Sequence, residues 1–356
     1  MKKKHSKAAA LAAEINQALK LEDGQGVMVG SDEYFRIERI PTGSLVLDRI
    51  TGGGFALGRH YELYGDENSA KSFILYCTIA LAQERGKLCA LVDPEHSYDL
   101  DWFEWVGGNT DDLLLHHPAN AEEAVAVMML LAKHAEEHEI QVIGIDSVAS
   151  MVTRVEMETD PRQEDRIAEQ ARMMSRALRR ITSVNRKTLF LWTNQERTNV
   201  GIKFGNPRTT SGGRALRFYA TGRIEFRRGT KVLGKRHIAR GGKLVESEIP
   251  VGRWIQCRVE KDKSTRPLRE GSFVFDNEQR TIDPAIEIVQ LGLEDGLIER
   301  QANGWYSYVD LENKEWRGTW NKFTGFLRDD MDLQQELVSA ISDRTEGDGE
   351  TDQTEM

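Results

Sequence analysis

A loop with the spacing of a phosphate-binding loop follows the apolar segment HYELY (60–64). Its residues, GDENSAKS (65–72), match the pattern G-x-x-x-x-G-K-[ST] except that Ala70 replaces the second glycine. Such a loop surrounds an anion with backbone N–H groups at the start of a helix, while Lys71 would contact the β- and γ-phosphates and Ser72 a magnesium ion. Alanine restricts the backbone more than glycine does, but it leaves helical torsions open. We therefore expect ATP to bind here, with contacts from Gly65, Asp66, Glu67, Asn68, Ser69, Ala70, Lys71, Ser72 and Phe73.

Two acidic residues lie at the ends of other apolar segments. Asp146 ends VIGID (142–146), and Glu95 lies near the end of LVDPEH (91–96). In an open α/β sheet, the carboxyl ends of parallel strands form the edge at which ligands bind. Either acid alone is better explained as a helix cap or a loop carboxylate. Taken with the loop, they indicate nucleotide hydrolysis, with Asp146 linked to Mg²⁺ and Glu95 orienting the attacking water.

Positive charge is concentrated in one part of the chain. The 69 residues from Arg172 to Arg240 contain 18 Lys and Arg residues and two acids, a net charge of +16. Such a block is typical of a nucleic-acid-binding face, and a solvated arginine-rich surface is the alternative. Within it, Arg172, Arg176, Arg179 and Arg180 recur at spacings of four, three and one, so three of them would line one helical face. This row would follow a phosphate backbone without reading base identity.

Strands and helices must alternate to bring these residues together. From residue 60 onward, segments with strand character (HYELYG, KLCALVD, QVIGID and KTLFLWTNQ) are separated by helical patterns at about 71–83, 122–138 and 164–182. Near-continuous apolar strands joined by helices indicate a mostly parallel sheet that is covered on both faces. The later segments RIEFRRG and RWIQCRVEK have no long helix between them, which favours antiparallel strands at the sheet edge.

The two ends of the chain have a different character. A short amphipathic helix is expected at residues 5–20, and a small helical segment with the hairpin-like NGWYSYVD begins near residue 280. The final ~12 residues, TEGDGETDQTEM, cannot form an apolar core and are expected to be disordered. Residues 329–356 contain ten acids and one arginine, so this tail accounts for the whole net charge of −9.

Composition excludes several classes of protein. A length of 356 residues suggests two domains or one large domain with satellites. No apolar run approaches the ~18 residues of a membrane helix and the basic N-terminus is interrupted by polar residues, so we expect neither a signal peptide nor a membrane protein. Three widely spaced cysteines exclude a disulfide scaffold and favour the cytoplasm. His134 and His138 could bind a metal, but no third ligand is evident and a solvated helix face is the favoured interpretation.

Longer segments of the chain resemble the bacterial RecA-type homologous recombinases and their phage-encoded relatives. They span about residues 36–310, and FGNPRTTSGGRALRFYA (204–220) is more specific than a general ATPase core. The matching segments are IPTGSLVLD (40–48), the phosphate loop, CALVDPEH (89–96), VIGIDSVA (142–149), ARMMSRALRR (171–180), TNQERTNVGIKFGNPRTTSGGRALRFYA (193–220), VEKDKSTRP (259–267) and NGWYSY (303–308).

The resemblance implies roles for residues at the nucleotide. Glu95 would activate water, and Gln195 would link the γ-phosphate to a DNA-binding loop. Lys261 and Lys263 would reach the ATP of a neighbouring subunit. The remaining contacts would be made to adenine by Asp99 and Trp102, and to Mg²⁺ by Ser72 and, through water, Asp146.

The resemblance also implies a DNA-binding face and a subunit interface. The first DNA-binding loop would lie near 157–168 and the second at 198–213, a stretch rich in glycine and lacking periodicity. Phe218 would lie at the subunit interface. The residues expected to contact DNA are Arg172, Arg176, Arg179, Arg197, Thr198, Asn199, Val200, Thr210, Ser211, Gly212, Gly213 and Arg214.

We accordingly expect an α/β fold. A RecA-like phosphate-loop ATPase core with a mostly parallel central sheet would carry a short N-terminal helix and polymerisation strand, and a small C-terminal α+β domain. The polymerisation strand, FRIERIPTGS (35–44), would extend a neighbour's sheet. The expected boundaries are 1–35 for the N-terminal helix and linker, 36–280 for the core, 281–330 for the small domain, and 331–356 for a terminal helix and acidic disordered tail.

The expected function is that of an ATP- and Mg²⁺-dependent homologous recombinase in the bacterial cytoplasm or nucleoid. It would form a filament on single-stranded DNA and exchange strands with a homologous duplex, with single-strand-binding and loading proteins as candidate partners. Two alternatives are a hexameric DNA motor with the same core and an ATP-binding DNA filament protein with little hydrolysis; Ala70 favours the second. The acidic METDPRQEDRI and the long basic GKRHIARGGKLVESEIP depart from the family pattern.

Overall fold

The chain divides into two units, Met1–Glu38 and Arg39–Met356, which are described separately. The computed structural model describes residues 7–20, 26–32, 36–158, 166–198, 208–240 and 243–351. In the first unit, helix α1 (Lys7–Leu19) contains an alanine-rich run that favours helix. The Asn16 side chain donates to the Val27 carbonyl at 3.0 Å and accepts from the Val27 N–H at 2.7 Å. The segment after α1 is therefore held back against the helix.

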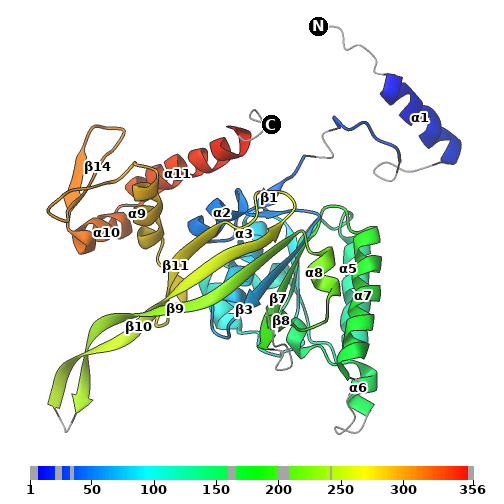
Figure 1. Cartoon of the computed structure of the whole chain (residues 1–356), viewed down its shortest axis with the longest axis horizontal. Helices are drawn as coiled ribbons and strands as arrows, with labels where there is room; N and C mark the ends of the chain where they lie inside the picture. Colours follow the sequence, from blue (N-terminus) through cyan, green and yellow to red (C-terminus); the bar gives the residue numbers. More distant parts are fainter. Residues whose placement is uncertain are drawn as a thin grey trace. The chain divides into compact units, whose positions relative to one another are not determined.

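A large sheet organises the second unit (Figure 1). Its strand order is β12-β11-β10-β9-β3-β7-β6-β4-β5, and the strands from β9 to β5 in this order are parallel, whereas the pairings among β9, β10, β11 and β12 are antiparallel. The predicted parallel sheet with antiparallel strands at its edge is thus confirmed. The strand bounds are β3 (His60–Gly65), β4 (Leu88–Val92), β5 (Leu113–His116), β6 (Ile140–Ile145), β7 (Leu189–Thr198), β9 (Gly222–Arg240), β10 (Lys243–Asp262), β11 (Glu270–Asp276) and β12 (Thr281–Ile282).

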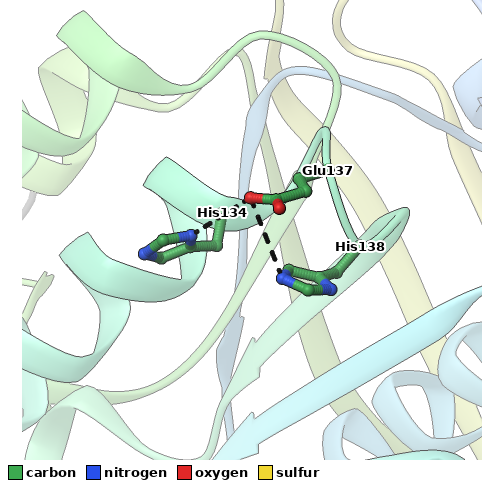
Figure 2. Close-up of side chains that lie close together, drawn as sticks. All are labelled: His134, Glu137 and His138. Carbon is green, nitrogen blue, oxygen red and sulfur yellow. Dashed lines mark ion pairs between the residues drawn. The ribbon is translucent and has the colours of Figure 1, made fainter.

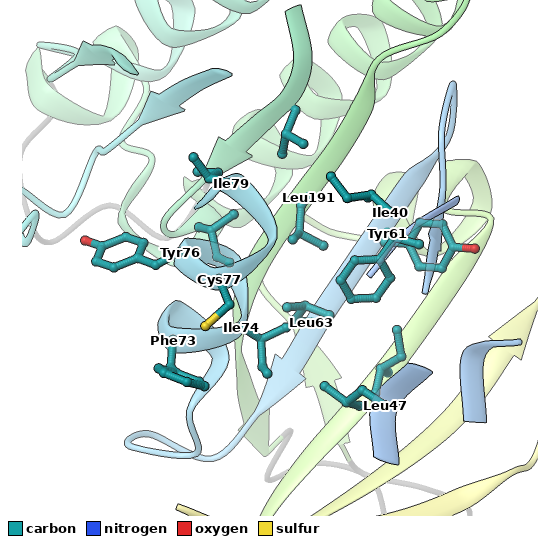
Figure 3. Packing of buried hydrophobic residues seen from close by; sticks show 14 of the residues in the cluster. Ile40, Leu47, Tyr61, Leu63, Phe73, Ile74, Tyr76, Cys77, Ile79 and Leu191 are labelled. Carbon is teal, nitrogen blue, oxygen red and sulfur yellow. The ribbon is translucent and has the colours of Figure 1, made fainter. Parts of the chain in front are cut away.

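Helices cover both faces of the sheet, because successive side chains of a strand point to opposite faces. In β7, Leu189 and Leu191 belong to one core and Phe190 and Trp192 to the other. The second core contains side chains of α5 (Ala121–His134) and of α7 (Arg166–Val184). His134, the last residue of α5, is exposed and is drawn in Figure 2. Figure 3 shows the first core, which packs α2 (Leu45–Thr51), α3 (Lys71–Glu84) and α4 (Leu100–Trp105) against the sheet.

Short elements complete this part of the chain. Within the described part of the expected polymerisation strand (36–44), two residues form a strand, β1 (Arg39–Ile40), which pairs with β2 (Phe55–Ala56) of the same chain. Strand β8 (Arg208–Thr210) pairs with the end of β7. Helix α6 (Arg154–Glu158) precedes α7, and helix α8 (Ala215–Tyr219) precedes β9. None of the helices in the described ranges is both long and apolar enough to cross a membrane.

Strands β9 and β10, which the sequence analysis placed at the sheet edge, are much longer than predicted and lie inside β11 and β12. Strand β9 pairs with β3 only over Gly222–Phe226, and β10 pairs with β11 only over Gly252–Arg258. Beyond those pairings, β9 and β10 continue as a two-stranded ribbon that projects from the sheet (Figure 1). The described residues of the long basic segment, 234–240 and 243–250, form the outer part of this ribbon.

The C-terminal segment builds its own apolar core. Helices α9 (Pro284–Glu294), α10 (Trp320–Asp329) and α11 (Met331–Thr351) surround a small antiparallel sheet of β13 (Glu299–Arg300), β14 (Tyr306–Val309) and β15 (Glu315–Gly318). Strand β14 confirms the predicted strand character of NGWYSYVD. Helix α11 continues to Thr351, into the segment that was expected to be disordered.

A buried carboxyl group joins this segment to the core. Glu287 of α9 accepts hydrogen bonds from the Ser44 hydroxyl at 2.5 Å and from the Leu45 N–H at 3.1 Å, at the first turn of α2. Burial raises the pKa of Glu287 to about 7. Arg49 of α2 adds an ion pair to Asp295 at 2.6 Å.

Candidate nucleotide and DNA-binding site

The phosphate loop connects β3 to α3, as predicted. Gly65 has a φ of +140°, and a Cβ atom at this position would lie 2.0 Å from the Phe226 carbonyl oxygen, so the close approach of β9 requires glycine. At the other end of the loop, Ala70 has φ 65° and ψ 18°, in the left-handed region. This conformation costs an L-residue roughly 1–2 kcal/mol. The pattern's second glycine therefore corresponds to a real backbone requirement, which this chain meets with a strained alanine.

The Lys71 ammonium group lies within the loop. It donates to the Asp66 carbonyl oxygen at 2.5 Å and to the Ser69 hydroxyl at 3.2 Å. Burial lowers the pKa of Lys71, whereas the nearby carboxylates, Asp146 first among them, favour its charged form. A cation surrounded by carbonyl and hydroxyl oxygens can exchange these partners for the oxygens of a phosphate group.

Asp146 follows β6 at the same edge of the sheet. Its Oδ1 accepts a hydrogen bond from the Thr193 hydroxyl at 2.5 Å, and Ser72 provides another hydrogen bond that favours the ionised carboxylate. Burial acts more strongly and raises the pKa of Asp146. A hydroxyl and a carboxylate side by side are the oxygen ligands that Mg²⁺ prefers. The donor set therefore fits a magnesium ion.

Glu95 lies on the loop after β4 and is exposed. Its Oε2 accepts a hydrogen bond at 3.0 Å from the hydroxyl of Ser147, the residue after Asp146. Asp93, which is buried, accepts from the backbone N–H groups of Glu95 at 3.1 Å and Tyr98 at 2.9 Å and so holds the loop. The structure thus brings the two predicted acids to neighbouring strand ends, and Ser147, which the sequence analysis did not single out, connects them.

An aromatic wall lies beside the phosphate loop. Asp99 caps α4 by accepting from the Trp102 N–H at 3.0 Å, and it pairs with Arg280 at 2.7 Å. The Arg280 guanidinium lies 4.0 Å from the centroid of the Trp102 ring, and the indole N–H donates to the Arg280 carbonyl at 3.0 Å. The hydrogen bond that the Arg280 guanidinium donates to the Asp99 carboxylate lowers the pKa of Asp99.

A pocket of about 490 Å³ extends from the phosphate loop to this wall. Three arginines that sequence reasoning missed line it together with Ala70, Lys71 and Trp102; they are Arg228, Arg253 and Arg280. They come from β9, from β10 and from the turn before β12. No motif links such distant positions, so only the sheet order could have identified them.

The lysine pair expected at a neighbouring subunit lies at the end of β10. Lys261 donates to the carbonyl oxygens of Arg217 at 2.7 Å and Phe218 at 3.2 Å, at the end of α8. Burial, followed by the charges of Lys263 and Arg223, lowers the pKa of Lys261 to about 8. The Phe218 side chain is 69% exposed, so it is accessible for contact with another subunit.

The predicted DNA-binding residues fall into three groups. On α7, Arg172, Arg176 and Arg179 are exposed, while Met174 and Leu178 on the other face are buried in the second core. At the end of the second DNA-binding loop, the structure describes Thr210, Ser211, Gly212, Gly213 and Arg214. Arg197 and Thr198 belong to β7, but their side chains lie outside the description, as do Asn199, Val200 and most of both predicted loops.

Two amides tie the end of the second loop to the nucleotide edge. Gln170 donates to the carbonyl oxygens of Val148 at 3.2 Å and Met151 at 2.9 Å, and it accepts from the Gly212 N–H at 3.3 Å. Asn194 donates to the Ser211 carbonyl at 3.0 Å and to Glu62 at 2.8 Å. Its neighbour Gln195 pairs in register with Gly65 of the phosphate loop. The sequence analysis named Gln195 as a candidate and did not name Gln170.

Comparisons with known proteins relate the chain to one family. Residues 9–277 match the family described as the RecA N-terminal domain. Two proteins named Protein RecA, from two strains of Thermus thermophilus, are each 34% identical to this chain. The first alignment covers 335 residues and 93% of both chains, and the second covers 333 residues and 92% of both.

Proposed function

This chain belongs to the RecA family of ATP-dependent recombinases and DNA-dependent ATPases, and from that premise we propose how its residues divide the work. The observation that carries the proposal is the convergence of three groups at the carboxyl edge of one sheet. Lys71 lies beside β3, Glu95 and Ser147 follow β4 and β6, and Asn194 of β7 holds Ser211 at the end of the second DNA-binding loop.

Lys71 and the loop N–H groups bind the phosphates of ATP, and the wall of Trp102 and Asp99 receives the adenine. Glu95 is the base that orients and activates water, with Ser147 aiming its carboxylate. Backbone positioning and fixed charge supply most of the catalysis in phosphoryl transfer, so each of these residues acts mainly by placement.

Magnesium fits the pair of Ser72 and Asp146. We assign the hydroxyl of Ser72 to direct coordination and the carboxylate of Asp146 to contact through water. The ion would neutralise charge on the β- and γ-phosphate oxygens. Thr193 holds the Asp146 carboxylate toward this position through its 2.5 Å hydrogen bond.

Single-stranded DNA binds along the arginines of α7 and the second loop. Arg172, Arg176 and Arg179 contact phosphates, which makes binding independent of sequence. Gln195 links the γ-phosphate to the second DNA-binding loop, because β7 pairs with β3 so that Gln195 lies beside Gly65 of the phosphate loop. The exposed Phe218 and the pair Lys261 and Lys263 face the next subunit in the filament. Homologous duplex DNA and single-strand-binding or loading proteins are the further partners, and the bacterial cytoplasm or nucleoid is the location.

The DNA face is tested by salt dependence. Replacing Arg172 and Arg179 together with alanine should weaken binding to all single-stranded sequences alike and flatten the dependence of log affinity on log salt by ~1–2. The matched control replaces Arg186 and Lys187, which follow α7, with alanine. This substitution removes the same amount of positive charge. Losses that depend on base sequence, or equal effects of both pairs, would reject the assignment.

Assembly is tested by imaging the protein with ATP and single-stranded DNA. A helical filament is expected, and closed rings would instead indicate a hexameric motor. A steady-state ATPase assay on the same DNA separates an active recombinase from a filament protein that barely hydrolyses ATP.

A further inference from the structure

Three side chains capable of binding metal lie together at the end of α5 (Figure 2). Helix α5 ends at His134, but the backbone N–H of His138 donates to the His134 carbonyl at 3.1 Å, so one more turn is closed. The two imidazoles therefore lie one turn apart on the same side. Glu137 lies between them, with its Oε2 3.7 Å from Nδ1 of His134 and 3.9 Å from Nε2 of His138.

We propose that His134, Glu137 and His138 form a surface site for a divalent transition-metal ion of the Zn²⁺ class. One ligand atom from each residue lies within 4.8 Å of the others. Zinc binds nitrogen at about 2.0–2.1 Å and carboxylate oxygen at about 2.0–2.2 Å, so tetrahedral ligand atoms lie roughly 3.3 Å apart. Rotation of these exposed side chains, which closes the ligand atoms from within 4.8 Å to roughly 3.3 Å, would bring them to one ion.

The donor set specifies the class of metal. Two imidazoles and one carboxylate form the His₂Glu combination of three-ligand zinc sites, which leaves a fourth position for water. Imidazole nitrogen favours zinc, copper and nickel, whereas Mg²⁺ requires oxygen ligands. The site therefore differs in selectivity from the Ser72 and Asp146 pair proposed for magnesium.

The surroundings support a cation at this position. The negative end of the α5 dipole favours positive charge within its last turn. The buried face of α5, with Ala124, Met128 and Ala132, holds the helix on the sheet. Nearby, Glu139 is paired with Lys87 at 2.7 Å, and the exposed Glu136 lies outside the group. The sequence interpretation of a solvated face rested on the lack of a third ligand, and the structure places Glu137 in that role.

The experiment is a calorimetric titration of the full chain with ZnCl₂, without nucleotide and with millimolar MgCl₂ present. We expect one Zn²⁺ ion per chain at this site. His134→Ala and His138→Ala should each weaken binding at least tenfold, and Glu137→Gln should weaken it severalfold. Glu136→Gln, the matched control, should bind as the unchanged protein does. Circular dichroism of each variant checks that α5 remains folded.

Three outcomes would overturn the proposal. One is the absence of Zn²⁺ binding, and another is full competition by Mg²⁺. The third is binding that survives both histidine substitutions, which would place the ion elsewhere, for example at His96 and His117, whose rings stack at 4.9 Å. The three cysteines are buried and do not offer an exposed competing ligand.

Discussion

The ammonium group of Lys261 donates a hydrogen bond to the carbonyl oxygen of Phe218 over 3.2 Å. Family resemblance assigns both residues to the contact between subunits, one at the neighbour's ATP and the other at the interface. They lie far apart in the sequence, on β10 and α8, yet the structure joins them at one surface. A change in the packing of Phe218 can therefore reach the lysine directly.

The lowered pKa of Lys261, about 8, predicts a dependence of activity on pH. A neutral lysine cannot attract the γ-phosphate, so DNA-stimulated ATPase activity should fall as pH rises through this value. For stability the sign is opposite. The unfolded chain keeps the Lys261 proton up to about pH 10.5, whereas the folded chain releases it near pH 8. The contribution of Lys261 to the free energy of unfolding therefore rises with pH between about pH 8 and pH 10.5.

Lys261→Arg is the control for that pH dependence. Guanidinium stays protonated throughout this range, so the activity lost above pH 8 should be retained to higher pH. Rates are measured from pH 6.5 to 9.5 at constant ionic strength. Identical profiles for the two proteins would remove Lys261 as the titrating group.

Alanine at both Lys261 and Lys263 should abolish DNA-stimulated hydrolysis but leave nucleotide binding by isolated subunits largely intact. The pair would stabilise charge on the γ-phosphate of the next subunit, as an arginine finger does. Mixing this variant with Lys71→Ala should restore part of the activity, because an intact loop then meets intact lysines at some interfaces. If both variants enter mixed filaments and the mixture remains inactive, the lysines do not act between subunits.

Glu95→Gln should bind ATP normally but turn over ~10²–10⁴-fold more slowly, because the amide keeps the shape and removes the base. Filaments should then persist longer on DNA. Ser147→Ala, which removes only the 3.0 Å hydrogen bond to Glu95, should cause a smaller loss. Single-turnover hydrolysis measures both, and a normal rate for Glu95→Gln would reject its role.

Ala70→Gly should stabilise the protein by about 1 kcal/mol, since glycine adopts the left-handed conformation without strain. The unfolded chain gains some entropy from glycine, which offsets part of this gain. Ala80→Gly within α3 is the control and should destabilise by about 1 kcal/mol or more. Urea unfolding without nucleotide compares the two, and destabilisation by Ala70→Gly would mean that the alanine is not strained.

Arg280→Ala should weaken ATP binding about threefold to tenfold, because Trp102 and Asp99 lose the group that holds them. Discrimination between adenine and guanine nucleotides should also fall. Arg300→Ala, which removes a comparable arginine near the Tyr306 ring, should leave affinity unchanged. Equilibrium titration with both nucleotides provides the measurement, and unchanged affinity in Arg280→Ala would assign the arginine a purely structural role.

Local patterns in the sequence determined the parallel sheet, the phosphate loop, the two acids and the arginine face of α7. Periods of 2 and 3.6 residues, and the chemistry of a loop before a helix, are contained in short windows. Such short windows do not predict the backbone conformation of Ala70. The sequence gives its residue type, but its left-handed conformation is set by the loop between β3 and α3.

Only the tertiary structure decided which distant groups meet. Arg280 covers Trp102 because β12 continues the sheet beside β11, and Gln170 reaches Gly212 because α7 lies against residues 148–151, which follow β6. Glu137 joins two histidines because the chain closes one more turn after α5. Strand order and register result from many weak contacts summed over the whole core, so no short window of sequence contains them.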